Sequence, residues 1–186
     1  MIQYLLKTTR FIPNEFHHSF FDINFQLLYD KGFRYIITDL DNTLISYDES
    51  QPTETIKNTF IKLQEMGFTL VLLSNNHTER INTFCHELHV DGFANAKKPF
   101  RYGFQKALRS MDGATKDKTV IIGDQLMTDI WGANRFGSYS ILVNPLKRKT
   151  EKWYTKMNRK LEAKMLQRIQ HKHPSIYQSL QLSERT

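Results

Sequence analysis

The feature that most limits how this chain can fold is a repeated alternation between short apolar runs and amphipathic stretches of helical period. The apolar runs hold few polar residues, which is typical of strands buried on both faces of a sheet. We expect strands at residues 35–38, 68–73, 92–94, 119–122 and 139–143, and helices at residues 53–66, 78–88, 101–111 and 126–136. This order predicts an α/β fold, a doubly wound parallel sheet with helices on both faces.

The two ends of the chain differ in composition from the part that carries this alternation. Residues 1–33 form an aromatic-rich segment that we expect to pack on the core, and residues 34–146 form the α/β domain. Pro145 lies at the end of that domain. Residues 147–186 then form a basic C-terminal extension with an amphipathic helix.

The basic character of the chain is confined to this extension. The net charge is +7, and residues 147–172 hold ten Lys and Arg residues against two acids, Glu151 and Glu162. The rest of the chain is therefore close to neutral, so the charge describes one segment and not the domain.

The bulk composition excludes several classes of protein. With 40% hydrophobic and 24% charged residues, the chain has the composition of a globular protein and not of a disordered or fibrous one. The single cysteine, Cys85, cannot form an intramolecular disulfide, which fits a reducing compartment. No signal-peptide pattern and no apolar run of roughly 20 residues is present. We expect a cytoplasmic protein, at most peripheral at the inner face of the membrane.

Chemically active side chains follow the expected strands at the points where those strands end. Asp39, Asp41 and Thr43 follow the first strand, Ser74 and Asn75 the second, Lys98 the third, and Asp124 and Asp129 the fourth. The carboxyl ends of parallel strands meet at one edge of a sheet, where such folds bind ligands. We expect these side chains to converge there.

Convergence of this kind predicts phosphoryl transfer. Carboxylates packed closely raise one another's pKa values, and a hard divalent cation such as Mg2+ relieves the repulsion. One carboxylate can attack phosphorus while another, two residues along, handles the proton. The Ser74 hydroxyl and the Asn75 backbone N–H can hold phosphoryl oxygens, and Lys98 supplies the positive charge that the transition state needs.

The same residues carry a resemblance to a known family. Asp39-Leu40-Asp41-Asn42-Thr43, Ser74-Asn75, Lys98-Pro99 and Gly123-Asp124 with Asp129 resemble, in order, the four motifs of the haloacid dehalogenase (HAD) phosphatase superfamily. The likeness covers roughly residues 34–145.

The resemblance implies a role for each of these residues. Asp39 is expected to be the nucleophile, and Asp41 the general acid and then the general base. Mg2+ is expected on Asp39, the Asp41 backbone carbonyl and Asp124. Thr43 is expected to orient the loop, and Asp129 to support Lys98 or a water on the metal.

The spacing of the motifs leaves no room for the cap domain that many members carry. Thr43 and Ser74 are separated by one expected helix and strand, and so are Ser74 and Lys98. The wording of the motifs resembles the YqeG-type, capless branch of the superfamily, which is related to mitochondrial phosphatidylglycerophosphate phosphatases. A capless site is open, so its substrate can be borne on a surface.

The C-terminal extension bears on that substrate. Its apolar residues recur every four positions, at Trp153, Met157, Leu161, Met165 and Ile169, with Lys152, Lys156, Arg159 and Lys160 towards the other face. Such a helix is attracted to anionic membranes, and it can equally pack on the domain. Nucleic acid is not expected as a partner, because no aromatic stacking positions alternate with the basic residues.

Three functions follow from these observations. The first is a phosphomonoesterase acting on a lipid headgroup such as phosphatidylglycerophosphate. The second is a phosphatase of a soluble metabolite or a phosphoprotein. The third is a membrane- or RNA-associated binding module in which the catalytic residues are incidental.

Overall fold

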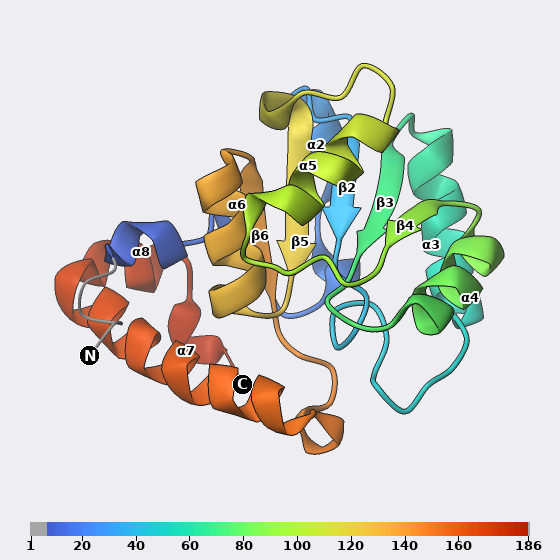
Figure 1. Cartoon of the computed structure of the whole chain (residues 1–186). Helices are drawn as coiled ribbons and strands as arrows, with labels where there is room; N and C mark the ends of the chain where they lie inside the picture. The colour runs from blue at the N-terminus through green and yellow to red at the C-terminus, as the bar shows by residue number, and fades with distance from the viewer. Residues whose placement is uncertain (1–6, 186) are drawn as a thin grey trace.

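The computed structural model describes residues 7–185 and contains a six-stranded parallel sheet (Figure 1). The strands lie in the order β1-β6-β5-β2-β3-β4. Their bounds are Glu15–His17 (β1), Tyr35–Thr38 (β2), Thr69–Leu73 (β3), Asp91–Phe93 (β4), Thr119–Gly123 (β5) and Tyr139–Val143 (β6). The helices are Phe25–Asp30 (α2), Glu54–Glu65 (α3), Thr78–Leu88 (α4), Arg101–Ser110 (α5), Trp131–Phe136 (α6), Trp153–Lys172 (α7) and Pro174–Ser179 (α8), with a π-helical turn, Leu126–Ile130, directly before α6.

The strand order places a topological switch point in the middle of the sheet. β2 pairs with β3 on one side and with β5 on the other. Thr38, the last residue of β2, lies opposite Leu72 and Ile122. The three central strands therefore end nearly level, and the loops that follow them open at one edge. This is the position at which open parallel sheets bind ligands.

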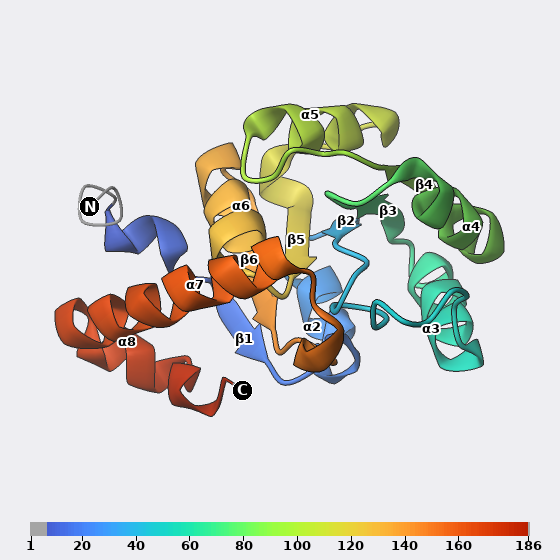
Figure 2. The ribbon, with the colours of Figure 1, turned by 60° about the horizontal axis from the view of Figure 1, so that its bottom comes forward.

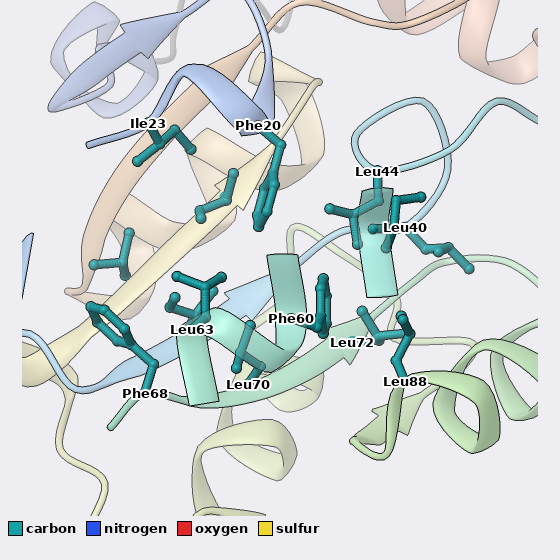
Figure 3. Close-up of a cluster of buried hydrophobic side chains, with 14 of the residues drawn as sticks. Phe20, Ile23, Leu40, Leu44, Phe60, Leu63, Phe68, Leu70, Leu72 and Leu88 are labelled. Carbon is teal, nitrogen blue, oxygen red and sulfur yellow. The ribbon is translucent and has the colours of Figure 1, made fainter. Parts of the chain in front are cut away.

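Alternating side chains of the central strands pack against the helices on the two faces. Ile36 faces one apolar cluster, together with Phe60 of α3, and the next residue, Ile37, faces the other, together with Phe104 of α5. Figure 3 shows the first cluster, in which Leu40 and Leu44 of the loop after β2 also lie. Burial on both faces explains why the strands are continuous apolar runs.

The N-terminal segment contributes more than core packing. Phe11 and Phe20 are fully buried, whereas Phe21 is exposed. In addition, β1 pairs in parallel with β6 and forms an edge of the sheet. The sequence analysis missed this strand because it is three residues long and carries no apolar run. Residues 1–6 of the expected N-terminal segment lie outside the described part of the chain.

The part of the chain that the structure describes contains no inserted cap. One helix, α3, lies between β2 and β3, and one helix, α4, lies between β3 and β4. No helix within residues 7–185 is both long enough and apolar enough to cross a membrane.

The C-terminal helix α7 passes the ends of β5 and β6 and packs against residues 8–11 and the π-helical turn (Figure 2). Met165 and Ile169 are buried, whereas Trp153 and Met157 are 75% and 55% exposed, and Arg159, which was expected on the opposite face of the helix, is buried. The apolar residues spaced by four therefore do not share one side of the helix. In an α-helix, residues spaced by four drift about 40° per step, so one such row cannot stay on a single face.

Candidate active site

The loop after β2 is held by its apolar residues and presents its acidic ones to the edge of the sheet. Leu40 and Leu44 are buried in the core cluster, while Asp39 and Asp41 line a cavity above it. Between them Asn42 adopts a left-handed backbone with φ of 61°, a conformation that Asn tolerates better than most residues. The alternation of Asp and Leu therefore fixes which side chains face the cavity.

Lys98 lies between two of the expected carboxylates. Its Nζ is 2.6 Å from Oδ1 of Asp39 and 2.6 Å from Oδ1 of Asp129. The hydroxyl of Thr43 donates to the other oxygen of Asp39 at 3.5 Å. Lys97, the preceding residue, is exposed.

Asp41 accepts hydrogen bonds from three side chains, two of which were not expected from the sequence. Its Oδ2 accepts from the Ser74 hydroxyl and from Asn76 Nδ2, each at 3.2 Å. Its Oδ1 accepts from Arg80 Nε at 2.7 Å. Arg80 lies in the first turn of α4, the helix that follows Ser74. No sequence pattern marks this arginine, because its partner Asp41 follows a strand that is distant in sequence.

Asn75 fixes the loop that carries Lys98. Its Oδ1 accepts from the Lys98 backbone N–H at 2.8 Å, and its Nδ2 donates to the Lys98 carbonyl at 3.2 Å. The sequence analysis assigned only the Asn75 backbone to the site. The side chain thus has a second role, that of setting the position of the lysine.

Asp129 approaches the end of β5 closely because residue 123 is a glycine. A Cβ built on Gly123 would lie 2.4 Å from the Asp129 carboxyl carbon. The Asp129 carboxylate also accepts from the Gln125 backbone N–H at 3.1 Å and from the Thr128 hydroxyl at 3.2 Å. The glycine and the turn after it therefore place Asp129 beside Lys98.

Asp124 is wholly buried, and its partner comes from the C-terminal helix. Arg159 of α7 donates to Oδ2 of Asp124 and, at 2.7 Å, to its backbone carbonyl. The same guanidinium binds Glu151 and Glu162, which are also buried. From the sequence, Arg159 was expected on the helix face opposite the apolar row, because an isolated arginine in a basic helix carries no signal of burial.

Burial and mutual repulsion shift the titration of the acids. Burial raises the pKa of Asp39 well above its usual range, and Lys98 offsets this only in part. Burial also raises the pKa of Asp124 to about 6, although Arg159 lowers it. Burial lowers the pKa of Lys98, but Asp129 and Asp39 outweigh burial and leave that pKa above its usual value. The lysine therefore stays charged.

The acids form a group that could hold a divalent cation. Asp39, Asp124 and Asp129 each place one ligand oxygen within 4.8 Å of the others. Oδ1 of Asp124 is buried and has no hydrogen-bond partner. A buried carboxylate oxygen in this state is costly unless a cation binds it. Hard oxygen ligands of this kind suit Mg2+.

A small cavity of about 50 Å³ lies over these groups. Part of its wall comes from the expected motifs, and part comes from α7 through Tyr154, Thr155 and Asn158. The motif loops contribute Asp39, Asp41, Ser74, Asn75, Asn76, Lys98, Gln125 and Thr128 to the lining. All of the expected site residues thus lie at or beside one cavity, with α7 as an additional wall.

Comparison with protein families gives one match over most of the chain. Residues 4–137 match the family described as haloacid dehalogenase-like hydrolase. This range contains every residue that the sequence analysis placed in the site, and it excludes Arg159.

Two curated relatives are similar over most of this chain. "Probable phosphatase YqeG" of Bacillus subtilis (strain 168) is 35% identical over 162 residues, covering 87% of this chain and 93% of that protein. "Phosphatidylglycerophosphate phosphatase 1, chloroplastic/mitochondrial" of Arabidopsis thaliana is 26% identical over 161 residues, covering 78% of this chain and 44% of that protein.

More distant relatives share only the central part. A "Glyceraldehyde 3-phosphate phosphatase" of Pyrococcus abyssi is 25% identical over 109 residues, covering 54% of this chain and 44% of that protein. Among solved structures, an uncharacterized protein from Listeria monocytogenes serotype 4b superimposes with a TM-score of 0.51 at 22% identity, covering 64% of this chain and 85% of that one. This structural likeness concerns the fold alone.

Proposed function

The chain belongs to the haloacid dehalogenase-like hydrolases and is a phosphatase of that family, and from this premise we propose that it hydrolyses a phosphate monoester through an aspartyl-phosphate on Asp39. The observation that carries the proposal is the buried Asp39–Lys98–Asp129 group, with Asp41 beside it in the same cavity. A carboxylate of this kind is a nucleophile, and a second one is an acid–base group.

The reaction has two steps in this site. A carboxylate oxygen of Asp39 attacks phosphorus, the bond between phosphorus and the ester oxygen breaks, and protonated Asp41 gives its proton to the leaving oxygen. Water then attacks the phosphorus of the aspartyl-phosphate, Asp41 takes its proton, and inorganic phosphate leaves. Lys98 balances the charge of the phosphoryl oxygens, and Arg80 holds Asp41 in place for both transfers.

Mg2+ is the proposed cofactor. Asp39 and Asp124 would hold it, with the Asp41 backbone carbonyl, and Asp129 lies in the same group. When bound, the ion offsets the charge that the carboxylates and the phosphoryl group bring together. Two observations support it: the partnerless Oδ1 of Asp124 and the raised pKa of that residue.

The dimensions of the cavity support a substrate whose bulk stays outside. A volume of about 50 Å³ accommodates a phosphoryl group and little more. The leaving group would then lie outside the cavity, whose wall includes Tyr154 of α7, next to the 75% exposed Trp153. An ester borne on a surface meets this requirement.

The exposed face of α7 supports a lipid surface as the carrier. The two acids within residues 147–172, Glu151 and Glu162, are both buried against Arg159. The charges that this segment presents to solvent are therefore basic, and they flank the exposed apolar side chains of Trp153, Met157 and Leu161. Interfacial aromatic and basic residues together bind anionic lipid.

We therefore propose a phosphorylated lipid headgroup, such as that of phosphatidylglycerophosphate, as the substrate at the membrane face. The Arabidopsis relative bears that name, although this chain spans less than half of its length. A soluble phosphate ester is the second candidate. The archaeal relative named for glyceraldehyde 3-phosphate favours it.

The experiment is phosphate release from phosphatidylglycerophosphate in anionic vesicles, with and without Mg2+, beside a panel of soluble phosphate esters. Asp39→Asn is the inactive control. Lipid turnover well above that of every soluble ester supports the headgroup substrate. Turnover of soluble esters alone would support the phosphatase activity but contradict the lipid substrate. Activity retained by Asp39→Asn would contradict the role of Asp39 as the nucleophile.

A further inference from the structure

Arg159 donates hydrogen bonds to both the side chain and the backbone carbonyl of Asp124. This arginine lies outside residues 4–137, the range that matches the family. Arg159 donates through Nη2 to Oδ2 of Asp124 and through Nη1 to the Asp124 carbonyl at 2.7 Å. Its other contacts are with Glu151, from Nε at 2.9 Å and from Nη2 at 2.7 Å, and with Glu162 at 3.3 Å. The planar guanidinium is therefore fixed on every side, and it fixes Asp124 in turn.

The hydrogen bond from Arg159 determines which carboxylate oxygen of Asp124 remains available to a cation. Oδ2 is used by Arg159, while Oδ1 is buried without a hydrogen-bond partner. Asp124 also belongs to the group of carboxylates that could share a cation with Asp39 and Asp129. Rotation of the Asp124 side chain would break its bond to Arg159, so the arginine selects the orientation seen here.

The same cluster is bonded to the loop after β2. Asn42 Nδ2 donates to Glu151 Oε1 at 3.2 Å. The Asn42 side-chain oxygen accepts from the Lys147 N–H at 3.3 Å, and its carbonyl accepts from the Leu146 N–H at 3.0 Å. The connection between β6 and α7 thus holds the nucleophile loop as well as the end of β5.

We propose that Arg159 is a positioning residue for the metal site, which makes the C-terminal helix a working part of that site. By holding Oδ2 of Asp124, Arg159 directs Oδ1 to the cation. The inference rests on the proposed function, because it takes the cation to be Mg2+. Groups that orient a ligand through its second polar atom typically change metal affinity about 10- to 100-fold.

The most informative variant keeps the positive charge of residue 159 and removes the two-pronged guanidinium group. Arg159→Lys retains one positive charge but cannot bind the Asp124 carboxylate and carbonyl together. We expect the dissociation constant for Mg2+, measured by isothermal titration calorimetry on the metal-free full chain, to rise about 10- to 100-fold. Saturating Mg2+ should then restore most of the kcat.

Arg185→Lys is the matched control. Arg185 also binds Glu162 and the Asp124 carbonyl, but it makes no bond with the Asp124 carboxylate. We expect its Mg2+ affinity to stay within about twofold of wild type even if its thermal stability falls. A purely structural role of the cluster would instead affect both variants alike.

Arg159→Gln separates orientation from charge, because the two act in opposite directions. A positive charge beside a cation site weakens cation binding, so an arginine that acted only by its charge would give tighter binding on its removal. Positioning gives weaker binding. Unchanged affinity in Arg159→Lys, or tighter affinity in Arg159→Gln, overturns the inference.

Two further results keep the test decisive. If the Arg159 variants do not fold, Glu151→Gln loosens the guanidinium from its other side, and a several-fold weaker affinity is expected; an unchanged value overturns the inference. If wild type binds no Mg2+, the proposed cofactor fails, and the inference fails with it. Wild-type binding with unaffected variants removes only the role of Arg159.

Discussion

Two buried cations serve the carboxylates at the ends of β2 and β5, and they do so in different ways. Lys98 reaches two carboxylates with one ammonium group and lines the cavity. Arg159 contacts three carboxylates and one carbonyl and is buried behind the cavity. An ammonium is a compact charge that can be shared with a substrate, whereas a guanidinium fork fixes geometry. We infer that Lys98 and its two carboxylates, the reactive side, take part in the chemistry. Arg159 and its three carboxylates, the frame side or frame, fix the positions of the residues around the site.

The largest effect should fall on the reactive side. Asp39→Asn removes the proposed nucleophile, and we expect kcat/KM to fall at least about 10³-fold. The thermal midpoint should hold or rise, because the variant removes a buried charge whose pKa is already raised by burial. Steady-state kinetics and calorimetric unfolding check the two halves. A large loss of stability with retained activity would show that Asp39 has a structural role and not a chemical one.

Substitution on the frame side should act first on stability. Arg159→Met leaves buried carboxylates without their cation, and breaking a buried ion pair in this way typically costs about 3–5 kcal/mol. We expect the free energy of unfolding, from urea titration at neutral pH, to fall by that amount. Lys164→Met, at an exposed lysine of α7, is the control. A loss below about 1 kcal/mol would show that Arg159 does not hold the frame.

The pH dependence of protein stability should differ between the metal-free and the Mg2+-bound protein. Burial raises the folded pKa of Asp124 to about 6, so between about pH 4 and 6 the folded state binds more protons than the unfolded state. In metal-free protein, this residue's contribution to stability therefore falls as pH rises through that window, by about 3 kcal/mol at most.

Mg2+ should cancel that decline, because it competes with the proton for Asp124. Thermal midpoints measured across the window with chelator and with Mg2+ should diverge as pH rises. Asp124→Asn should flatten the metal-free curve. Parallel curves with and without Mg2+ would place the cation elsewhere.

The smallest effect concerns the exposed lysines of α7. Lys156→Gln with Lys160→Gln should weaken binding to anionic vesicles by about 1 kcal/mol per lysine, or about 30-fold together. Turnover of a soluble ester should not change. Lys62→Gln with Lys118→Gln, two exposed lysines on other elements, is the matched control. Co-sedimentation that is equal for both pairs would remove the membrane role.

The residues that follow the strands could be predicted from the sequence, whereas Arg159, which holds Asp124, could not. Asp39, Ser74, Lys98 and Asp124 each follow an apolar run, and the parallel order of those runs brings their ends together. Three predicted ranges, 35–38, 78–88 and 139–143, match β2, α4 and β6 to the residue.

The missed residues have a common cause. Arg80 and Arg159 lie on helices and reach carboxylates that follow strands distant in sequence. A lone arginine on a helix is indistinguishable from a solvated one until the partner's position is known. The strand at residues 15–17 was missed because its pairing with β6 is far in sequence and its own residues are polar and aromatic.

The measurement that tests the account most directly is mass spectrometry of the enzyme quenched in acid during turnover. The account expects a phosphoryl adduct on the peptide that contains Asp39, which borohydride reduction converts to homoserine at that position. The adduct should require Mg2+ and be absent from Asp39→Asn. An adduct on any other residue, or full turnover with no adduct under single-turnover conditions, would contradict the mechanism.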